Sequence, residues 1–199
     1  ADSIAIYPSY SYGDAMRITG GRYRGRIITC PPGEIRPAMD RMRESLFSIL
    51  SDIADLSFLD LFSGSGLVGI EAASRGAQPV HLVELDVQKR TTILKNISFV
   101  ETEIKLFSSN VLRFLPQAKR QYDIVYADPP FPMKRKTEIA ELVEAHHVLV
   151  PRGLFIIHYP AEEQSLWPER IGSLTFTDER KYGRSLVRFY RQEADERAT

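Results

Sequence analysis

A glycine-rich loop between a strand and a helix constrains the fold of this chain more than any other feature. Residues Phe58 to Gly69 read FLDLFSGSGLVG, an apolar run followed by glycines at the spacing G-x-G-x-x-G. Glu84 comes 20 residues after Gly64, at the end of the next apolar run, where an acid that holds a ribose belongs. The loop and the acid together predict a site for an adenosine-containing cofactor. They do not separate a dinucleotide from S-adenosylmethionine.

The chain beyond residue 57 alternates between strand-like and helix-like patterns. The strand-like runs are 57–62, 79–84, 103–107, 122–127 and 153–159, and the helix-like segments between them are 67–75, 87–99, 110–118 and 137–147. This alternation predicts an α/β, Rossmann-like fold with helices on both faces of a mostly parallel, seven-stranded sheet. Two further strand-like runs, 172–179 and 184–191, predict an antiparallel C-terminal hairpin that finishes the sheet.

The N-terminal part of the chain follows a different pattern. Residues 16–19 and 26–29 alternate in the manner of two short strands and predict a small β-hairpin, and residues 39–51 have the apolar spacing of an amphipathic helix. We therefore divide the chain into an N-terminal extension, 1–52, and a main domain, 53–199.

Arginine is concentrated in this extension, although the formal net charge of the whole chain is zero. Between residues 17 and 43 seven arginines stand against two acids, Glu34 and Asp40. Arginine forks onto phosphates and stacks on bases, so an all-arginine cluster favours a nucleic acid partner over a merely solvated surface. The candidate contacts are Arg17, Arg22, Tyr23, Arg24, Arg26, Arg36, Arg41 and Arg43.

A second candidate site follows the strand-like run that ends at Ala127. Asp128-Pro129-Pro130-Phe131 cannot continue a sheet, because proline donates no backbone N–H, so the chain leaves the sheet as a stiff loop. The carboxylate and carbonyls of this loop suit the hydrogens of an exocyclic amine, while Phe131 suits stacking on a flat ring. For Pro-Pro alone, an ordinary proline-rich turn is the alternative.

The candidate residues lie at the ends of predicted strands, where ligands of open α/β sheets bind. Asp60 favours S-adenosylmethionine, which carries a sulfonium and an ammonium, over a pyrophosphate, which needs an electropositive helix N-terminus. An acid that caps a helix or braces the loop is the alternative for Asp60. Asn110 fits either a contact with the adenine edge or a helix N-cap. The expected cofactor-binding residues are Asp60, Phe62, Gly64, Ser65, Gly66, Glu84, Leu85, Asn110, Val111 and Asp128.

A carbonyl-rich loop beside a sulfonium donor favours methyl transfer to nitrogen. The expected catalytic residues, Asp128, Pro129, Pro130 and Phe131, would hold the amine in line with the methyl group and offset the developing positive charge. This chemistry needs no metal and no covalent nucleophile, and the histidines at 81, 146, 147 and 158 lack metal-ligand spacing. The basic run 134–136 after the loop fits either a phosphate-binding lip or a solvated loop.

These motifs resemble those of class I S-adenosylmethionine-dependent methyltransferases. More narrowly, the chain resembles the RsmD family, which methylates the guanine N2 of 16S ribosomal RNA. The most family-specific parts are RITGGRYRGR at 17–26 and the segment from Arg36-Pro37 to Phe47. The family usually has two hydroxyl-bearing residues after Arg-Pro, and this chain departs from the pattern with Ala38-Met39.

The resemblance implies a function and its partners. It implies that S-adenosylmethionine is the cofactor, that residues 128–131 receive a flipped guanine, and that the N-terminal arginines bind 16S rRNA in a small-subunit assembly particle. From the residues alone, N6 of adenine in RNA or DNA and a glutamine amide remain open as substrates. An NAD-dependent dehydrogenase and a non-catalytic rRNA-binding protein are the alternatives from other classes.

The composition predicts a cytoplasmic protein that does not enter a membrane, and we expect it to be a monomer, although the sequence does not determine the oligomeric state. The chain is 43% hydrophobic and 26% charged, and it contains one cysteine, Cys30, so an intrachain disulfide is excluded. No apolar run approaches the roughly 20 residues that cross a bilayer, and the N-terminal residues lack the layout of a signal peptide.

Overall fold

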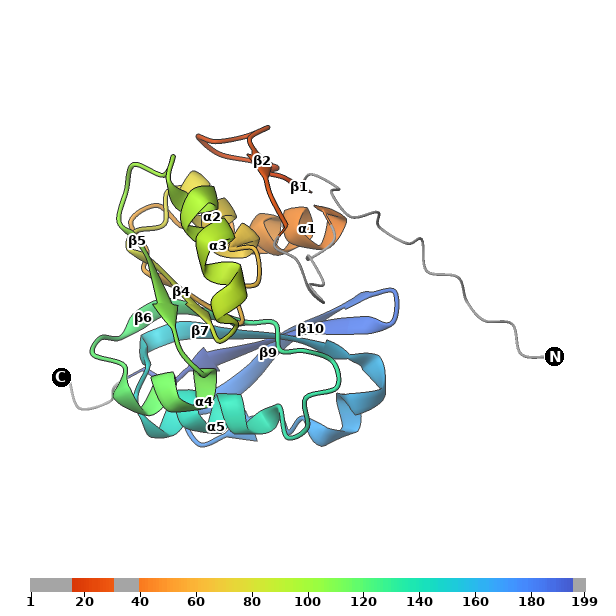
Figure 1. Ribbon diagram of the computed structural model, residues 1–199. Coiled ribbons are helices and arrows are strands. Elements are labelled where there is room, and N and C mark those ends of the chain that lie inside the picture. Colours follow the sequence, from red (N-terminus) through yellow and green to blue (C-terminus); the bar gives the residue numbers. More distant parts are fainter. Residues whose placement is uncertain (1–15, 31–39, 195–199) are drawn as a thin grey trace.

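An eight-stranded sheet forms the centre of the computed structural model, which describes residues 16–30 and 40–194 (Figure 1). Its strand order is β5-β4-β3-β6-β7-β10-β9-β8. The parallel strands are β3 (Phe58–Leu61), β4 (Val80–Glu84), β5 (Ile104–Ser108), β6 (Tyr122–Ala127) and β7 (Leu149–Pro160). The α/β fold with a mostly parallel sheet is thereby confirmed.

The C-terminal strands complete the sheet as the predicted antiparallel hairpin. β10 (Ser185–Gln192) runs antiparallel between β7 and β9 (Leu174–Tyr182). The sheet has eight strands rather than seven because a two-residue strand, β8 (Arg170–Ile171), pairs with β9 at the edge.

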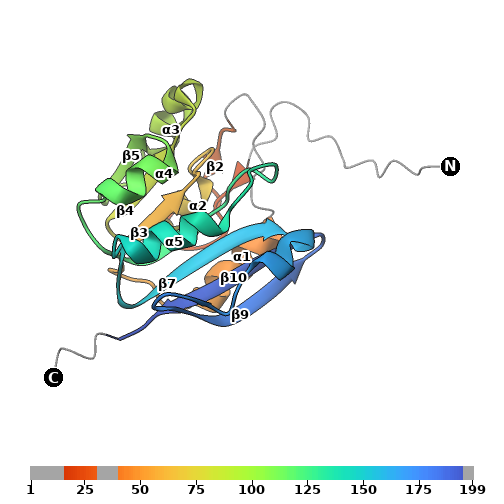
Figure 2. The same cartoon turned by 90° about the horizontal axis from the view of Figure 1, so that it is seen from below.

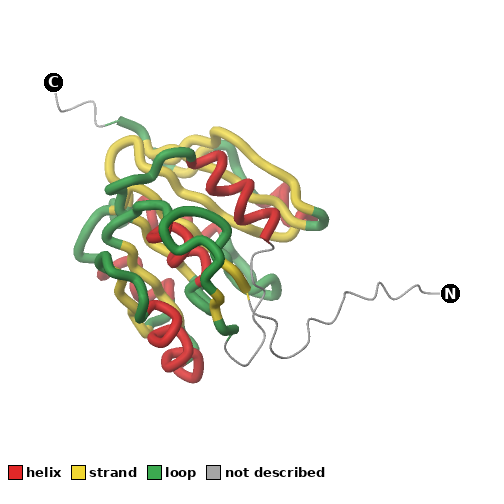
Figure 3. The backbone as a smooth tube through the Cα atoms, turned by 90° about the horizontal axis from the view of Figure 1, so that it is seen from above, coloured by secondary structure: helices red, strands yellow, loops and turns green. Residues whose placement is uncertain are grey.

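Helices cover both faces of the sheet. One core packs α1 (Asp40–Leu50), α2 (Leu67–Ser74) and α3 (Arg90–Ile97) on one face, and Figure 3 shows α1 lying over the C-terminal strands. The other face carries α4 (Val111–Phe114) and α5 (Thr137–Ala145), which lie side by side in Figure 2. The 3-10 turns η1, η2 and η3 span Val87–Lys89, Leu115–Gln117 and Ala161–Leu166. Among the described helices, none has both the length and the apolar character that a membrane span requires.

The alternation of side chains along β3 explains how one short strand serves both cores. Phe58 belongs to the core beneath α1 to α3, whereas Leu59 and Leu61 belong to the core beneath α4 and α5, because successive side chains of a strand point to opposite faces. Asp60 therefore points to the same face as Phe58, toward α2. Its carboxylate accepts a hydrogen bond from a backbone N–H of that helix.

The N-terminal hairpin packs against α2. Its strands, β1 (Met16–Arg17) and β2 (Ile27–Ile28), are shorter than predicted, since the chain bends at Gly20-Gly21 to approach the end of that helix. A Cβ atom at Gly21 would lie 2.0 Å from the carbonyl oxygen of Ser74, so glycine is required for this approach. The division of the chain at residue 52 remains a prediction.

Candidate active site

A cavity of about 1010 Å³ lies at the carboxyl ends of β3, β4 and β6. It brings together nine of the ten expected cofactor residues and all four residues of the predicted catalytic loop: Asp60, Phe62, Gly64, Ser65, Glu84, Leu85, Asn110, Val111, Asp128, Pro129, Pro130 and Phe131. The tenth, Gly66, is buried at the start of α2 rather than on the cavity wall. The cavity therefore joins the two candidate sites into one.

The glycine loop is held in shape by Glu84. One carboxylate oxygen accepts a hydrogen bond from the backbone N–H of Gly64 at 2.8 Å, and the other accepts from Asp86 at 2.9 Å. Phe62 has φ 62° and Gly66 has φ 83°, in the left-handed region that glycine adopts readily and phenylalanine does not. The backbone of Phe62 is therefore strained. Such strain is commonly found at ligand-binding sites.

Asp60 is a buried carboxylate at the floor of the cavity. Its side chain accepts a hydrogen bond from the backbone N–H of Gly69 at 3.0 Å. Burial raises the pKa of Asp60 well above its usual value, and the nearby carboxylates of Asp128 and Glu84 raise it further. A cationic ligand beside these three acids would stabilise the ionised form.

The hydroxyl of Tyr126 is a buried hydrogen-bond donor at the cavity. Its side chain is fully buried on β6, next to Asp60 of β3 in the strand register, and it lines the cavity. Among the described residues its hydroxyl has no hydrogen-bond partner. Burial, with Asp128 and Asp60 nearby, raises its pKa, so the hydroxyl stays protonated. An unpaired buried donor costs about 1–3 kcal/mol, and a polar ligand in the cavity would satisfy it. The three acids and the Tyr126 hydroxyl therefore fit a cationic, polar cofactor such as S-adenosylmethionine.

Asn110 is a helix N-cap in the structure. Its Oδ1 accepts from the backbone N–H of Leu112 at 2.8 Å, and the residue also lines the cavity. The capping alternative is thus observed. A contact of the same residue with the cofactor stays a prediction.

The loop after β6 is held at both ends. The backbone N–H of Asp128 donates to the carbonyl of Leu61 at 3.3 Å. Lys136 is buried and its ammonium donates to the carbonyls of Phe131 at 2.8 Å and Met133 at 2.6 Å and to Glu163 at 2.7 Å. Lys136 therefore stabilises the loop and is not part of a phosphate-binding lip.

Carbonyl oxygens of the loop are less available to a substrate than the sequence suggested. That of Phe131 accepts from Lys136, and that of Pro130 accepts from the backbone N–H of Met133 at 2.9 Å. The carboxylate of Asp128, with Oδ1 at 2.9 Å from a histidine, remains a candidate acceptor for an amine. Its partner His158 was missed by the sequence analysis.

The structure divides the predicted nucleic acid contacts into exposed and buried residues. Arg17, Arg22, Arg24, Arg26 and Arg41 are exposed, while Arg36 lies outside the described residues. Arg22 pairs with Glu101, and Arg26 lies over the ring of Phe99 at 4.8 Å from its centroid. The exposed arginines remain candidate nucleic acid contacts.

Two of the predicted contacts are wrong on structural grounds. Arg43 is fully buried and binds Glu71, Asp40 and the carbonyl of Arg17. Tyr23 is 6% exposed: its backbone N–H donates to Ser74, and its hydroxyl accepts from the backbone N–H of Glu101 at 2.9 Å. Both side chains hold the extension in place and neither can reach a nucleic acid.

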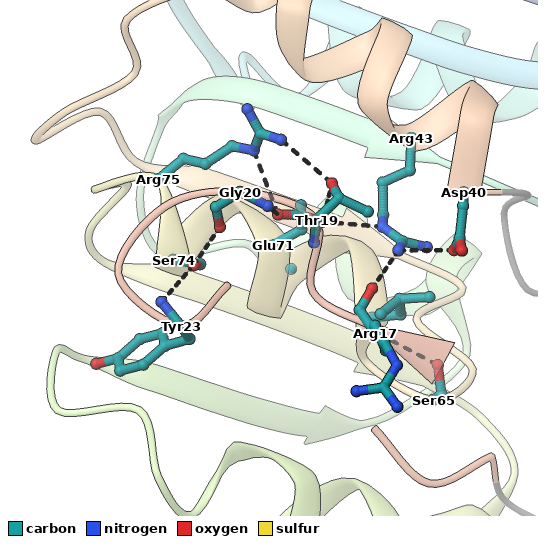
Figure 4. A network of polar contacts seen from close by, with 12 residues as sticks. Arg17, Thr19, Gly20, Tyr23, Asp40, Arg43, Ser65, Glu71, Ser74 and Arg75 are labelled. Atoms are coloured by element: carbon teal, nitrogen blue, oxygen red, sulfur yellow. Dashed lines mark hydrogen bonds and ion pairs between the residues drawn. The ribbon is translucent and has the colours of Figure 1, made fainter. Parts of the chain in front are cut away.

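Glu71 is the centre of the network that holds the extension (Figure 4). This buried carboxylate of α2 accepts from the backbone N–H and hydroxyl of Thr19 at 2.8 and 2.7 Å and from the backbone N–H of Gly20 at 3.0 Å. It also accepts from Arg43 at 3.0 Å and from Arg75 at 3.3 Å. The hairpin is thus fixed to the helix that begins at the glycine loop.

A second link connects the hairpin directly to the glycine loop. The side chain of Asn96 on α3 donates to the carbonyls of Thr29 at 2.8 Å and Ser65 at 2.9 Å, and accepts from the backbone N–H of Thr29 at 3.1 Å. Ser65 lines the cavity. One amide therefore joins the arginine hairpin and the candidate cofactor site.

Known proteins share both the sequence and the architecture of this chain. Residues 16–191 match the model of the family described as conserved hypothetical protein 95. Ribosomal RNA small subunit methyltransferase D of Escherichia coli (strain K12) is 34% identical over 191 residues, covering 94% of this chain and 95% of that protein. The protein of the same name from Haemophilus influenzae is 31% identical over 161 residues, covering 77% and 83%. The solved structure of yhhF, a candidate methyltransferase from Escherichia coli, has a TM-score of 0.80 at 33% identity, covering 91% and 99%.

Proposed function

The chain belongs to the family described as conserved hypothetical protein 95 and has the class I methyltransferase fold, and from this premise we propose that it is an rRNA methyltransferase of the small ribosomal subunit. Two relatives from Escherichia coli strains are named ribosomal RNA small subunit methyltransferase D, and each is matched over 95% of its length. At the finer level, we propose transfer of a methyl group from S-adenosylmethionine to the exocyclic N2 amine of a guanine in 16S rRNA.

The cofactor would occupy the part of the cavity between the glycine loop and α4. When bound, it supplies a methyl group activated by attachment to a sulfonium. Glu84 stands where the ribose hydroxyls would lie, Asp60 and Tyr126 offer an acceptor and a donor to the polar end, and Leu85 and Val111 offer apolar contact to the adenine. The unpaired hydroxyl of Tyr126 is the observation that supports a polar ligand there.

The loop from Asp128 to Phe131 would hold the substrate base. The carboxylate of Asp128 accepts an N–H of the exocyclic amine, which fixes the nitrogen in line with the methyl group. The same negative charge offsets the positive charge that develops on nitrogen during transfer. Phe131 stacks on a base turned out of its helix, a common arrangement where chemistry occurs on a base.

The exposed arginines of the hairpin and α1 would contact the phosphates of the RNA. Arg22, Arg24 and Arg26 are presented on the hairpin that Glu71 and Asn96 hold next to the cofactor helix. Phosphate contacts of this kind give affinity that falls with salt and position the substrate without reading its sequence.

One observation carries the proposal: a single cavity contains both the acids of the cofactor part and the amine-binding loop. The test is transfer of labelled methyl from S-adenosylmethionine to 16S rRNA or to a small-subunit particle, with Asp128→Ala as the control. We expect transfer by the wild type and none by the variant, which should keep its affinity for the cofactor. Binding of S-adenosylmethionine without transfer to any rRNA would contradict the proposal.

The same geometry also accommodates N6 of adenine, so the modified base needs its own measurement. Digestion of the methylated RNA to nucleosides separates N2-methylguanosine, which we expect, from N6-methyladenosine. Calorimetry that finds binding of NAD instead of S-adenosylmethionine would favour a dehydrogenase, and absence of binding by both would favour a non-catalytic RNA-binding protein.

A further inference from the structure

His158 is a buried histidine that contacts the candidate catalytic carboxylate. It lies near the end of β7, beside β6, and its Nδ1 is 2.9 Å from Oδ1 of Asp128. Its Nε2 is 2.7 Å from the hydroxyl oxygen of Ser185 on β10. The imidazole thus connects the amine-binding loop to the antiparallel strand behind it.

The hydrogen-bond partners of Ser185 restrict where protons can lie. The Ser185 hydroxyl is also 3.0 Å from the carbonyl of Tyr182, to which it can only donate. If it donates there, Nε2 of His158 must carry a proton, and a hydrogen bond between Nδ1 and Asp128 then requires a second proton. If it donates to Nε2 instead, the single proton of a neutral ring sits on Nδ1 and is donated to Asp128. The second arrangement gives a hydrogen bond from Nδ1 to Asp128 with a neutral ring.

The same ring also contacts Phe131. The two rings meet edge to face with centroids 5.6 Å apart and an interplanar angle of 65°, an arrangement that aromatic pairs prefer. One side chain therefore restrains both the acceptor of the loop, Asp128, and its stacking surface. Among the described residues, Asp60 on β3 and Tyr126 on β6 are titratable groups close to Asp128 in this cluster.

We propose that His158 is a positioning residue for methyl transfer, which fixes the Asp128 carboxylate and the Phe131 ring in the geometry that holds the substrate amine. This inference rests on the proposed function. Tying Oδ1 to β7 fixes the orientation of the second carboxylate oxygen, which then accepts from the amine. An error of about 1 Å in such a position costs on the order of 100-fold in rate.

Three substitutions separate this role from simple core packing. His158→Asn keeps an amide nitrogen near the position of Nδ1, His158→Gln keeps one near Nε2, and His158→Leu keeps neither. We expect kcat to fall about 10- to 100-fold in the Leu variant, to fall nearly as far in the Gln variant, and to stay within a few-fold of wild type in the Asn variant. The affinity for S-adenosylhomocysteine and the KM for RNA should change less than about twofold in all three.

The measurements are methyl transfer at saturating RNA, calorimetry with S-adenosylhomocysteine, and thermal melting. Equal kcat for the Asn, Gln and Leu variants, whether unchanged or lowered together, overturns the inference while the wild type remains active. If the Leu variant does not fold, the Asn and Gln variants alone decide, because a purely structural role does not rank Asn above Gln in kcat at equal melting temperature. An inactive wild type overturns the proposed function and the inference together.

Discussion

Replacing Glu71 by glutamine should loosen the arginine hairpin from α2, the helix that begins at the glycine loop. Five donors converge on this carboxylate, and one of them belongs to Arg43, which is fully buried. An amide has a single acceptor oxygen, and its NH₂ group faces donors, so at least two of these bonds are lost in Glu71→Gln. The guanidinium of Arg43 then loses its buried carboxylate partner, while its ion pair with the exposed Asp40 remains.

The structure indicates the size of the effect. Removing one partner of a buried ion pair costs about 3–5 kcal/mol, and here the fully buried guanidinium of Arg43 loses the partner that is buried with it. A chain of this length loses about 2–4 °C in melting temperature per kcal/mol. We therefore expect Glu71→Gln to melt roughly 6–20 °C below the wild type. Amide hydrogen exchange at Thr19, Gly20 and Tyr23 should accelerate, since their N–H groups lose partners on α2.

The pH dependence provides a second check. Burial alone would raise the pKa of Glu71, but hydrogen bonds from Thr19, Arg43 and Gly20 together hold it below its usual value of 4.5. An acid whose folded pKa is lowered contributes stability above its ordinary pKa and loses it as the pH falls through the folded pKa. The gap in melting temperature between wild type and variant should therefore be full at neutral pH and shrink below pH 4.5.

A matched control isolates the buried site. Glu141 is an exposed acid on α5, and Glu141→Gln should change the free energy of unfolding by no more than about 0.5 kcal/mol. A Glu71→Gln variant that melts within about 2 °C of wild type, with unchanged exchange in the hairpin, would refute the reasoning. It would mean that the other contacts of the extension, among them the bonds of Tyr23 to Ser74 and of Thr29 to Asn96, hold it without Glu71.

Three further substitutions test the cavity and its link to the hairpin. Asp60→Asn should raise the melting temperature at neutral pH, because burial raises the pKa of Asp60 and makes its charge costly in the folded state. A lowered melting temperature would contradict this reasoning. Calorimetry of the same variant should show weaker binding of S-adenosylmethionine. Gly69→Ala places a Cβ 2.2 Å from the side chain of Leu82, so chemical denaturation should show a loss of about 1–3 kcal/mol. Asn96→Leu cuts the bridge between hairpin and glycine loop, and both cofactor affinity and RNA affinity should fall; a loss of one alone would mean that the two sites are not linked through this amide.

The main features of the fold and of the cavity follow from local patterns in the sequence. The strand ends, the glycine spacing and the acid at residue 84 are each defined by neighbours within a few residues, and parallel strands bring their carboxyl ends to one edge. Tyr126 and His158 are different, because each reads as part of an apolar strand. Their roles depend on pairing with Asp60 across β3 and with Asp128 across β6, which no local pattern specifies.

Arg43 was predicted to contact a nucleic acid because of the arginine-rich composition around it, and the structure shows that it is buried. It belongs to an arginine-rich segment, and its charge was expected to meet phosphate. The carboxylate that it binds lies 28 residues later on α2, and the burial of both groups depends on the tertiary structure. Exposure, and not residue type, separates the arginines that can contact a nucleic acid from the one that holds the hairpin.

The position of Glu71 on α2 explains why a buried ion pair is useful here. Apolar packing often stabilises a fold as well as a buried ion pair does, so the network is weak evidence for stability as such. The network does fix how the hairpin is oriented on α2, because each donor must lie within hydrogen-bond distance of a Glu71 oxygen. The helix α2 has eight residues, about 12 Å in length, with the cofactor loop at its start and the hairpin at its end. The exposed arginines are therefore held at a fixed distance from the cavity. Under the proposed function, the phosphates on either side of the modified base would therefore be bound at a fixed distance from the loop of Asp128.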